Sequence, residues 1–497
     1  YKYERLAGSR EEFPSDALTD MEAGSTSGAG YTNGAGSSEY KMLSYFARVN
    51  YTLMDRYLLE VNMRADASSR FHKDHRWGYF PSFSAGWRMN EEGFMKDIEW
   101  INNLKIRASY GTLGNINNVG NYDYFQNYSS GNHYNFSDSP VIGIGESKPA
   151  NETLGWEKVA LTDIGLDFDI FNGLLGVTAD YYIKNTSDIL LGYNVPTETG
   201  ITAAPSQNIG KVKNTGFELA LNHRNKIGAV NYSIGANIAT NKNKITNLGG
   251  SDNIIQTSSY IVKYILKKGE SIGSFYGFKT DGLYTQADID AGHYYTLSGV
   301  VPNAGDVKFV PQRDIEYKQE ITDEDRTILG KDVPDFTYGV NLSLQYKGFE
   351  FSMFGQGISG TKVAFDVYGV HPFYHGQDNP RKYHLKRWTE ENPNPYAAYP
   401  RLYSASSVHT TYNRNFSDYH LFDSDYFRFK TLSLGYTVPS ATVKSWGLQS
   451  LKVYVTGENL FTVRADKKME DFDPETAGGV IYTLGTKSVA FGVNISF

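Results

Sequence analysis

Residues 486–497 read TKSVAFGVNISF, and the alternation in this last stretch decides the fold class. Every second residue from Val489 to Phe497 is apolar, and only small or polar residues stand between them. A period of two puts every second side chain on the same side of a β-sheet. One face of the predicted strand is therefore apolar and the other suits water better than a packed core, which is typical of a transmembrane β-barrel strand.

The same alternation recurs along the chain, for example in LKIRASYGTLG at residues 104–114 and in YGVNLSLQY at residues 338–346. Charged residues in the middle of these strands fall on the second, polar face. A charge on the lipid face at the middle of the bilayer costs about 2 to 4 kcal/mol, so a membrane would enforce this segregation. A large soluble β-sandwich also alternates, but it gives no reason for mid-strand charges. The predicted lumen-facing residues are Arg107, Asp167, Asp169, Asp180 and Glu350.

Composition favours the same fold class. The 497 residues contain 38 tyrosines and no cysteine, and the mean hydropathy is −0.45. No apolar run approaches the roughly 20 residues that a transmembrane helix needs. A barrel explains a membrane protein this polar, because half of each strand faces the lumen. The net charge of −7 argues against nucleic acid as a partner, and the absence of cysteine excludes disulfides and cysteine metal sites.

Short connections alternate with long ones. The short connections are predicted at residues 54–55, 171–174, 225–228, 347–348 and 439–449. The long loops are predicted near residues 9–40, 115–155, 187–210, 247–334, 358–424 and 464–485. Short periplasmic turns and long extracellular loops are typical of outer-membrane barrels, and the spacing predicts about fourteen antiparallel strands of about 9 to 12 residues.

Several segments together resemble the C-terminal part of a SusC/RagA-type TonB-dependent outer-membrane transporter of the Bacteroidetes. They are spread through nearly the whole chain. The segments are FARVNYTLMDRYLLEVN (46–62), RWGYFPSFSAGW (76–87), LKIRASYGTLGN (104–115), NTGFELAL (214–221), IGSFYGFKTDGL (272–283), YFRFKTLSLGY (426–436) and VTGENL (455–460).

This resemblance implies a plugged barrel of about 22 strands, of which the whole chain, residues 1–497, would supply the C-terminal part. Because YKYERLA at residues 1–7 reads as the middle of a strand, we expect the N-terminal plug, the TonB box and the first strands to be absent from this chain. The implied function is active import of oligomeric nutrients across the Bacteroidetes outer membrane. The implied partners are the TonB complex, a SusD-like lipoprotein lid, the N-terminal part of the same transporter and the lipid bilayer, with no cofactor. A non-transporting binding or structural barrel is the alternative.

The loop at residues 358–424 concentrates aromatic and basic residues. Flat aromatic faces beside polar donors can hold sugar rings or peptide side chains, and the same residue types are enriched at protein interfaces. The same rings could instead pack the loop itself. The sequence leaves a glycan and an oligopeptide open as substrates. The candidates for binding substrate or lid are Tyr368, His371, Tyr374, Arg381, Trp388 and Arg401.

Motifs that resemble catalytic or metal sites carry little weight here. GESIG around Ser271 and GQGISG at residues 355–360 lack a predicted following helix, which a nucleophile elbow or a dinucleotide site requires. His371 and His375 lack the glutamate of a zinc protease. Many members of the resembled family carry a calcium-loop pattern, D-x-N-x-D-G, but QRDIEYKQEITDEDRTILG at residues 312–330 lacks it. We therefore expect no metal at Asp323, Glu324 and Asp325 and no enzymatic activity.

Overall fold

The computed structural model describes residues 2–5, 37–136, 139–192, 206–257, 261–365, 371–372, 379–475 and 485–497. The chain divides into two compact units. The first consists of Tyr1–Trp87, Arg107–Asp163 and Lys184–Val212, and the second of Arg88–Ile106, Ile164–Ile183 and Lys213–Phe497. None of the helices in the described ranges is long and apolar enough to cross a membrane.

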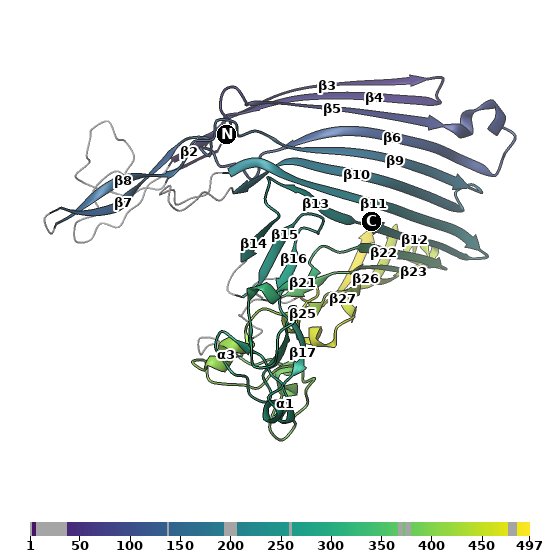
Figure 1. Cartoon of the computed structure of the whole chain (residues 1–497). Helices are drawn as coiled ribbons and strands as arrows, with labels where there is room; N and C mark the ends of the chain where they lie inside the picture. Colours follow the sequence, from purple (N-terminus) through teal and green to yellow (C-terminus); the bar gives the residue numbers. More distant parts are fainter. Residues whose placement is uncertain are drawn as a thin grey trace. The chain divides into compact units, whose positions relative to one another are not determined.

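One sheet of 14 strands, counted over the described residues, dominates the fold (Figure 1). A short strand, β13 (Lys242–Leu248), pairs with β11 off the main order. The main order is β28 (Ser488–Ser496), β27 (Ser450–Arg464), β26 (Tyr426–Thr437), β23 (Phe349–Ser359), β22 (Phe336–Tyr346), β12 (Val230–Thr240), β11 (Ser206–Ile227), β10 (Leu175–Gly192), β9 (Glu157–Ile170), β6 (Ile101–Asn115), β5 (Trp77–Arg88), β4 (Tyr57–Ser68) and β3 (Met42–Leu53). The predicted number of strands is therefore confirmed, although β13 is shorter than a predicted spanning strand.

Neighbouring strands pair antiparallel, with apolar side chains opposite one another. Val455 lies opposite Phe491, and Val453 lies opposite Val493. The apolar side chains of the strands are largely exposed, Phe491 at 83% and Tyr79 at 61%. A water-soluble sheet would cover such a face, whereas in a transmembrane barrel the lipid covers it.

Tight turns join several of these strands. Met54 and Asp55 connect β3 to β4, and Lys347 and Gly348 connect β22 to β23, all four with positive φ. Two-residue turns with positive φ at both positions match the twist of a β-hairpin. The predicted turn at residues 225–228 is displaced, because β11 continues to Ile227 and the chain reverses at the following two residues. The connection at 439–449 contains the short helix α4 (Ser440–Lys444).

The long connections fold into elements of their own. Those of the first unit include β1 (Lys2–Arg5) paired with β2 (Ser37–Tyr40) and β7 (Asn127–Phe136) paired with β8 (Ser139–Lys148). Those of residues 247–334 are β14 (Asn253–Thr257), β15 (Lys263–Lys267), β16 (Ser274–Gly277), β17 (Lys279–Leu283), α1 (Gln286–Ala291), β18 (Thr296–Leu297), β19 (Val307–Val310), β20 (Glu320–Ile321), η5 (Asp323–Asp325) and β21 (Thr327–Lys331). Those of residues 358–424 are β24 (Lys362–Ala364), η7 (Lys382–Lys386), α3 (Val408–Asn413), η8 (Asp418–His420) and β25 (Leu421–Asp423). In the described ranges, the remaining short helices are η2 (Met89–Glu91), η3 (Gly93–Met95) and η9 (Lys467–Asp471).

The buried hydrophobic cores of the second unit lie in these loops. Three clusters of buried apolar residues are built from the loops at residues 247–334, 358–424 and 464–485. Figure 1 shows α1, α3 and β17, which belong to two of these loops, grouped together in the lower part of the view. These loops therefore form a packed body with its own interior.

Candidate functional site: the folded outer loops and the polar face of the sheet

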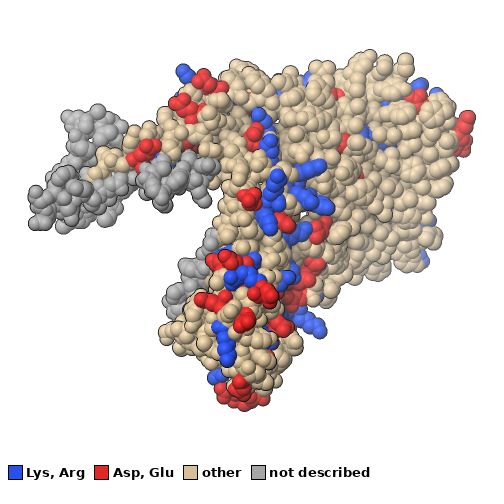
Figure 2. Space-filling view, viewed as in Figure 1, with Lys and Arg blue, Asp and Glu red and all other residues tan. Residues whose placement is uncertain are grey.

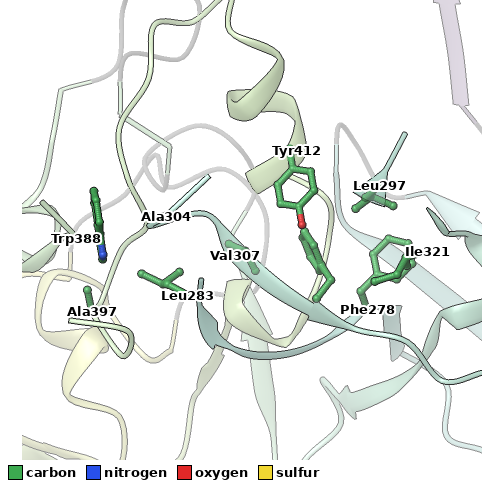
Figure 3. Packing of buried hydrophobic residues seen from close by; sticks show 10 residues of the cluster. Phe278, Leu283, Leu297, Ala304, Val307, Ile321, Trp388, Ala397 and Tyr412 are labelled. Atoms are coloured by element: carbon green, nitrogen blue, oxygen red, sulfur yellow. The ribbon is translucent and has the colours of Figure 1, made fainter. Parts of the chain in front are cut away.

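The loops at residues 247–334 and 358–424 share one hydrophobic core. Leu283, Val307 and Phe309 come from the first loop, and Trp388 and Tyr412 come from the second. Figure 3 shows Trp388 beside Leu283 and Ala397, and Tyr412 on the opposite side of Val307. The ring of Tyr412 meets that of Phe309 edge to face at 5.2 Å. Because both loops contribute to this core, neither can be removed without exposing apolar surface of the other.

A buried carboxylate also joins these two loops. Asp306 is fully buried and accepts hydrogen bonds from the side chain of Asn413 at 2.9 Å and from the backbone N–H of Asn303 at 2.7 Å. The ring Nδ1 of His409 lies 2.8 Å from the same carboxylate. The neighbouring Gly305 has φ +90° and lies against the ring of Trp388, so a larger residue would be strained there. Asp306 and Gly305 therefore fix the contact between the loops.

Two of the sequence-predicted loop candidates lie inside the loop body. His371 is 2% exposed, and its Nδ1 lies 3.0 Å from the hydroxyl of Tyr399. Burial lowers the pKa of His371 well below its usual value, and the neighbouring His420 lowers it further. Trp388 is buried in the shared core. In this conformation both residues support the loop from within and do not present a surface.

The two arginine candidates are partly exposed and engaged. The guanidinium of Arg401 lies 5.4 Å from the ring centre of Trp388 and 5.6 Å from that of Tyr403, and it pairs with Glu390 at 2.8 Å. Arg381 lies 4.9 Å from the ring centre of Phe472. Tyr368 and Tyr374 lie outside the described residues. Large apolar side chains that do reach the loop surface include Leu385 and Tyr396, each 76% exposed.

Arginine side chains pair with the carboxylates of the acidic turn at residues 323–325. Asp325 accepts hydrogen bonds from the guanidinium of Arg313 at 2.6 Å and from the backbone N–H groups of Gln312, Arg313 and Thr322. Burial alone would raise the pKa of Asp325, but these donors outweigh it and lower the pKa to about 2. Asp323 pairs with Arg326. The two carboxylates therefore already have cationic partners within the protein. Figure 2 shows Asp and Glu side chains at the tip that carries α1 in Figure 1. Acidic and basic side chains both lie in the region above that tip in the same view.

The predicted lumen residues each have a polar neighbour on the sheet. Arg107 lies 4.0 Å from Asp163. Asp167 accepts from Thr178 at 3.5 Å, and Asp169 accepts from Asn103 at 3.1 Å.

The remaining two predicted lumen residues line hollows. Asp180 lines a hollow of about 450 Å³ together with Glu218, Asn237, Gln356 and Tyr426. Glu350 pairs with Lys452 in a second hollow of about 270 Å³. The sheet therefore keeps charged and amide side chains together on one face.

One cluster on this polar face was not among the sequence candidates. Arg428 of β26 is 4% exposed and pairs with Asp473 at 2.6 Å and with Glu475 at 2.7 Å. Its signal in the sequence is the alternation of Arg428 and Lys430 with aromatic residues in YFRFK, followed by the acidic EDFDPE at residues 470–475. Only the fold brings these two segments together.

Comparison with known proteins identifies the family. The family described as TonB dependent receptor-like, beta-barrel, matches residues 5–460. TonB-dependent receptor P3 of Formosa agariphila is 32% identical over 431 residues, which cover 86% of this chain and 41% of that protein. TonB-dependent receptor SusC of Bacteroides thetaiotaomicron is 29% identical over 467 residues, which cover 92% of this chain and 43% of that protein.

The similarity extends to solved structures. A structure described as that of the RagAB peptide transporter matches with a TM-score of 0.75 and 26% identity, over 98% of this chain and 50% of that chain. This chain thus spans about half the length of the solved chain and somewhat less than half of the two receptors. Since the family match covers most of residues 1–497, the chain belongs to the TonB-dependent receptor family as part of its β-barrel.

Proposed function

We propose that this chain is the barrel part of an active importer in the outer membrane of a member of the Bacteroidetes. The importer would be energised through TonB and would take up an oligomeric nutrient. The observation that carries the proposal is the two-sided sheet of a TonB-dependent receptor. Exposed apolar side chains such as Phe491 fill one face, while Asp180, Glu350 and Arg428 lie on the other. Lipid outside and an aqueous path inside account for this division.

We further propose a SusD-like surface lipoprotein as the partner on the outer loops. The folded body of residues 247–334 and 358–424 supports the proposal, because a body with its own core can present a defined surface for binding a second protein. The exposed side chains of Leu385 and Tyr396 supply the aromatic and apolar surface that protein interfaces use.

The substrate class is an oligopeptide or a glycan. The RagAB structures are described as a peptide transporter and importer, which favours a peptide. The chain is 29% identical to SusC and 26% identical to the RagAB peptide transporter, so sequence identity alone does not favour one of these relatives over the other. Partly exposed aromatic and cationic groups such as Tyr403 and Arg401 suit both classes, because rings stack on sugars and on apolar side chains alike.

Growth of a deletion strain tests the proposal. Cells lacking the full-length transporter should fail to grow when size-limited oligopeptides or oligosaccharides are the sole nutrient source. Growth should return with the intact gene. A full-length variant without a functional TonB box should bind its nutrient but not restore growth. Restored growth with that variant would contradict energised import. Binding without any growth phenotype of the deletion would favour the alternative, a binding or structural barrel.

A further inference from the structure

Residues 467–475 of the second unit form a strap that contacts the rest of this unit at two points. At the first point, Phe472 is 3% exposed and packs between aromatic rings. Its ring centre lies 4.5 Å from that of Phe365, 5.3 Å from that of Phe422 and 5.7 Å from that of Tyr383. The backbone N–H of Tyr383 also donates to the carboxylate of Asp471 at 3.1 Å. The strap is therefore joined to the core of the 358–424 loop.

At the second point, two carboxylates of the strap meet Arg428. The two terminal nitrogens of Arg428 donate to Asp473 at 2.6 Å and to Glu475 at 2.7 Å, and its Nε donates to Thr462 at 2.9 Å. Lys430 adds a bond to Glu475 at 2.6 Å. A guanidinium presents its donors in a rigid planar fork, so it fixes the direction of these contacts as well as their charge balance.

The strap lies on the polar face of the sheet. The side chains of Gln356 and Tyr426 both reach Glu475, at 3.5 Å and 3.0 Å. The same two residues line the 450 Å³ hollow that contains Asp180. Strands β23, β26 and β27 thus all contribute to holding the strap next to this hollow, on the face that the proposed import would use.

We propose that Arg428 is a positioning residue that holds the strap over this polar face, and that the strap limits the size of the solutes that pass there. The second half of this proposal rests on the proposed import function. Without Arg428, Asp473 would lose its paired cation and Glu475 would keep only Lys430. The two neighbouring carboxylates would then repel each other with less compensation, so the strap would be held more weakly at this point.

Proteolysis of the full-length transporter in detergent tests the position of the strap. Arg428→Met should raise the rate of tryptic cleavage after Lys467 or Lys468 by about tenfold or more, because local opening exposes these bonds. The cleavage rate of Arg428→Lys should lie between those of Arg428→Met and the parent protein. Lys452→Met is the matched control, since Lys452 lies on the same face but pairs with Glu350, away from the strap. Exchanging the charges in Arg428→Glu/Glu475→Arg should restore resistance in part. An unchanged cleavage rate in Arg428→Met would overturn the proposal.

Uptake of two size ladders tests the second half. Cells with the parent or the Arg428→Met transporter receive size-fractionated casein hydrolysate or a maltooligosaccharide ladder, and mass spectrometry follows which lengths disappear. The variant should consume longer oligomers than the parent. An unchanged cut-off, together with faster cleavage of the strap, would refute the size-limiting role and leave the positioning role. Uptake of neither ladder by the parent would refute the proposed import and the size-limiting role with it, and the cleavage rates would still decide the position of the strap.

Discussion

Acid should loosen the 358–424 loop because His420 is buried within it as a neutral side chain. Its ring is 5% exposed, lies 5.3 Å from that of His371 and has Nδ1 within 3.1 Å of the hydroxyl of Ser417. Burial lowers the pKa of His420 to about 4, and the cation of Lys468 acts in the same direction. The other groups that titrate or carry charge around His371 are His384 and Arg414, and they also disfavour a second positive charge.

The size of the effect follows from the difference between the folded and unfolded pKa values. Above pH 6.5 both states are neutral at His420 and the loop keeps its full stability. Below pH 6.5 the opened loop binds a proton that the folded loop does not, so stability falls until the pH reaches the folded value of about 4. At pH 5 the loss is about 2 kcal/mol, a roughly thirtyfold increase in the opened population, and it approaches about 3 kcal/mol below pH 4. His371 adds a loss of the same sign.

Hydrogen exchange of the full-length transporter measures this opening. Protection of residues 379–424, corrected for the intrinsic exchange rate at each pH, should drop between pH 7.5 and pH 5. His420→Phe removes the titrating group and should show a smaller drop, while His75→Asn, which changes an exposed histidine, should behave like the parent protein. Protection that stays constant over this range, or an equal drop in His420→Phe, would refute the reasoning.

Three further predictions follow from single contacts. Val340→Arg should destabilise the membrane-inserted barrel by about 2 to 4 kcal/mol and reduce its assembly in a heat-modifiability assay. Asn341→Arg, on the face shared with Asn222 and Gly235, should assemble like the parent protein. Equal yields of the two variants would contradict the assigned faces. Arg313→Met should leave Asp325 without its cation, loosen the turn that holds it and speed proteolysis of the 247–334 loop relative to Lys318→Met, an exposed control. Leu385→Ser and Tyr396→Ser should lower co-purification of a lipoprotein lid at unchanged barrel assembly, and unchanged co-purification would remove these residues from the interface.

The strands were predictable from the sequence because lipid and water impose a local rule. Each apolar position, such as Val340 or Phe491, is set by the alternation of its own strand, so a short window contains the information. The turn at Lys347 and Gly348 is equally local. The predicted turn near Asn225 was displaced because β11 and β12 remain paired to Ile227 and Val230, a pairing that depends on both strands.

The loop interior was not predictable for the opposite reason. Asp306 meets Asn413, and Phe278 exchanges backbone hydrogen bonds with Phe416 and Asp418, across more than a hundred residues of chain. No periodicity marks such contacts. The same holds for Arg428, whose partners lie in the loop that follows the next strand. The sequence could place Arg428 on the polar face, but only the fold shows what it holds.

Aromatic residues serve two different purposes in this chain, and composition alone cannot separate them. On the strands, Tyr79 and Phe491 are exposed because lipid takes the place of a protein core. In the loops, Trp388 and Tyr412 are buried because water surrounds the loop body and an interior must be built from the chain itself. The aromatic richness of the 358–424 loop therefore first reflects its need for a core. Recognition of a nutrient or a lid then falls to side chains that this core leaves accessible, such as Leu385, Tyr396 and Arg401.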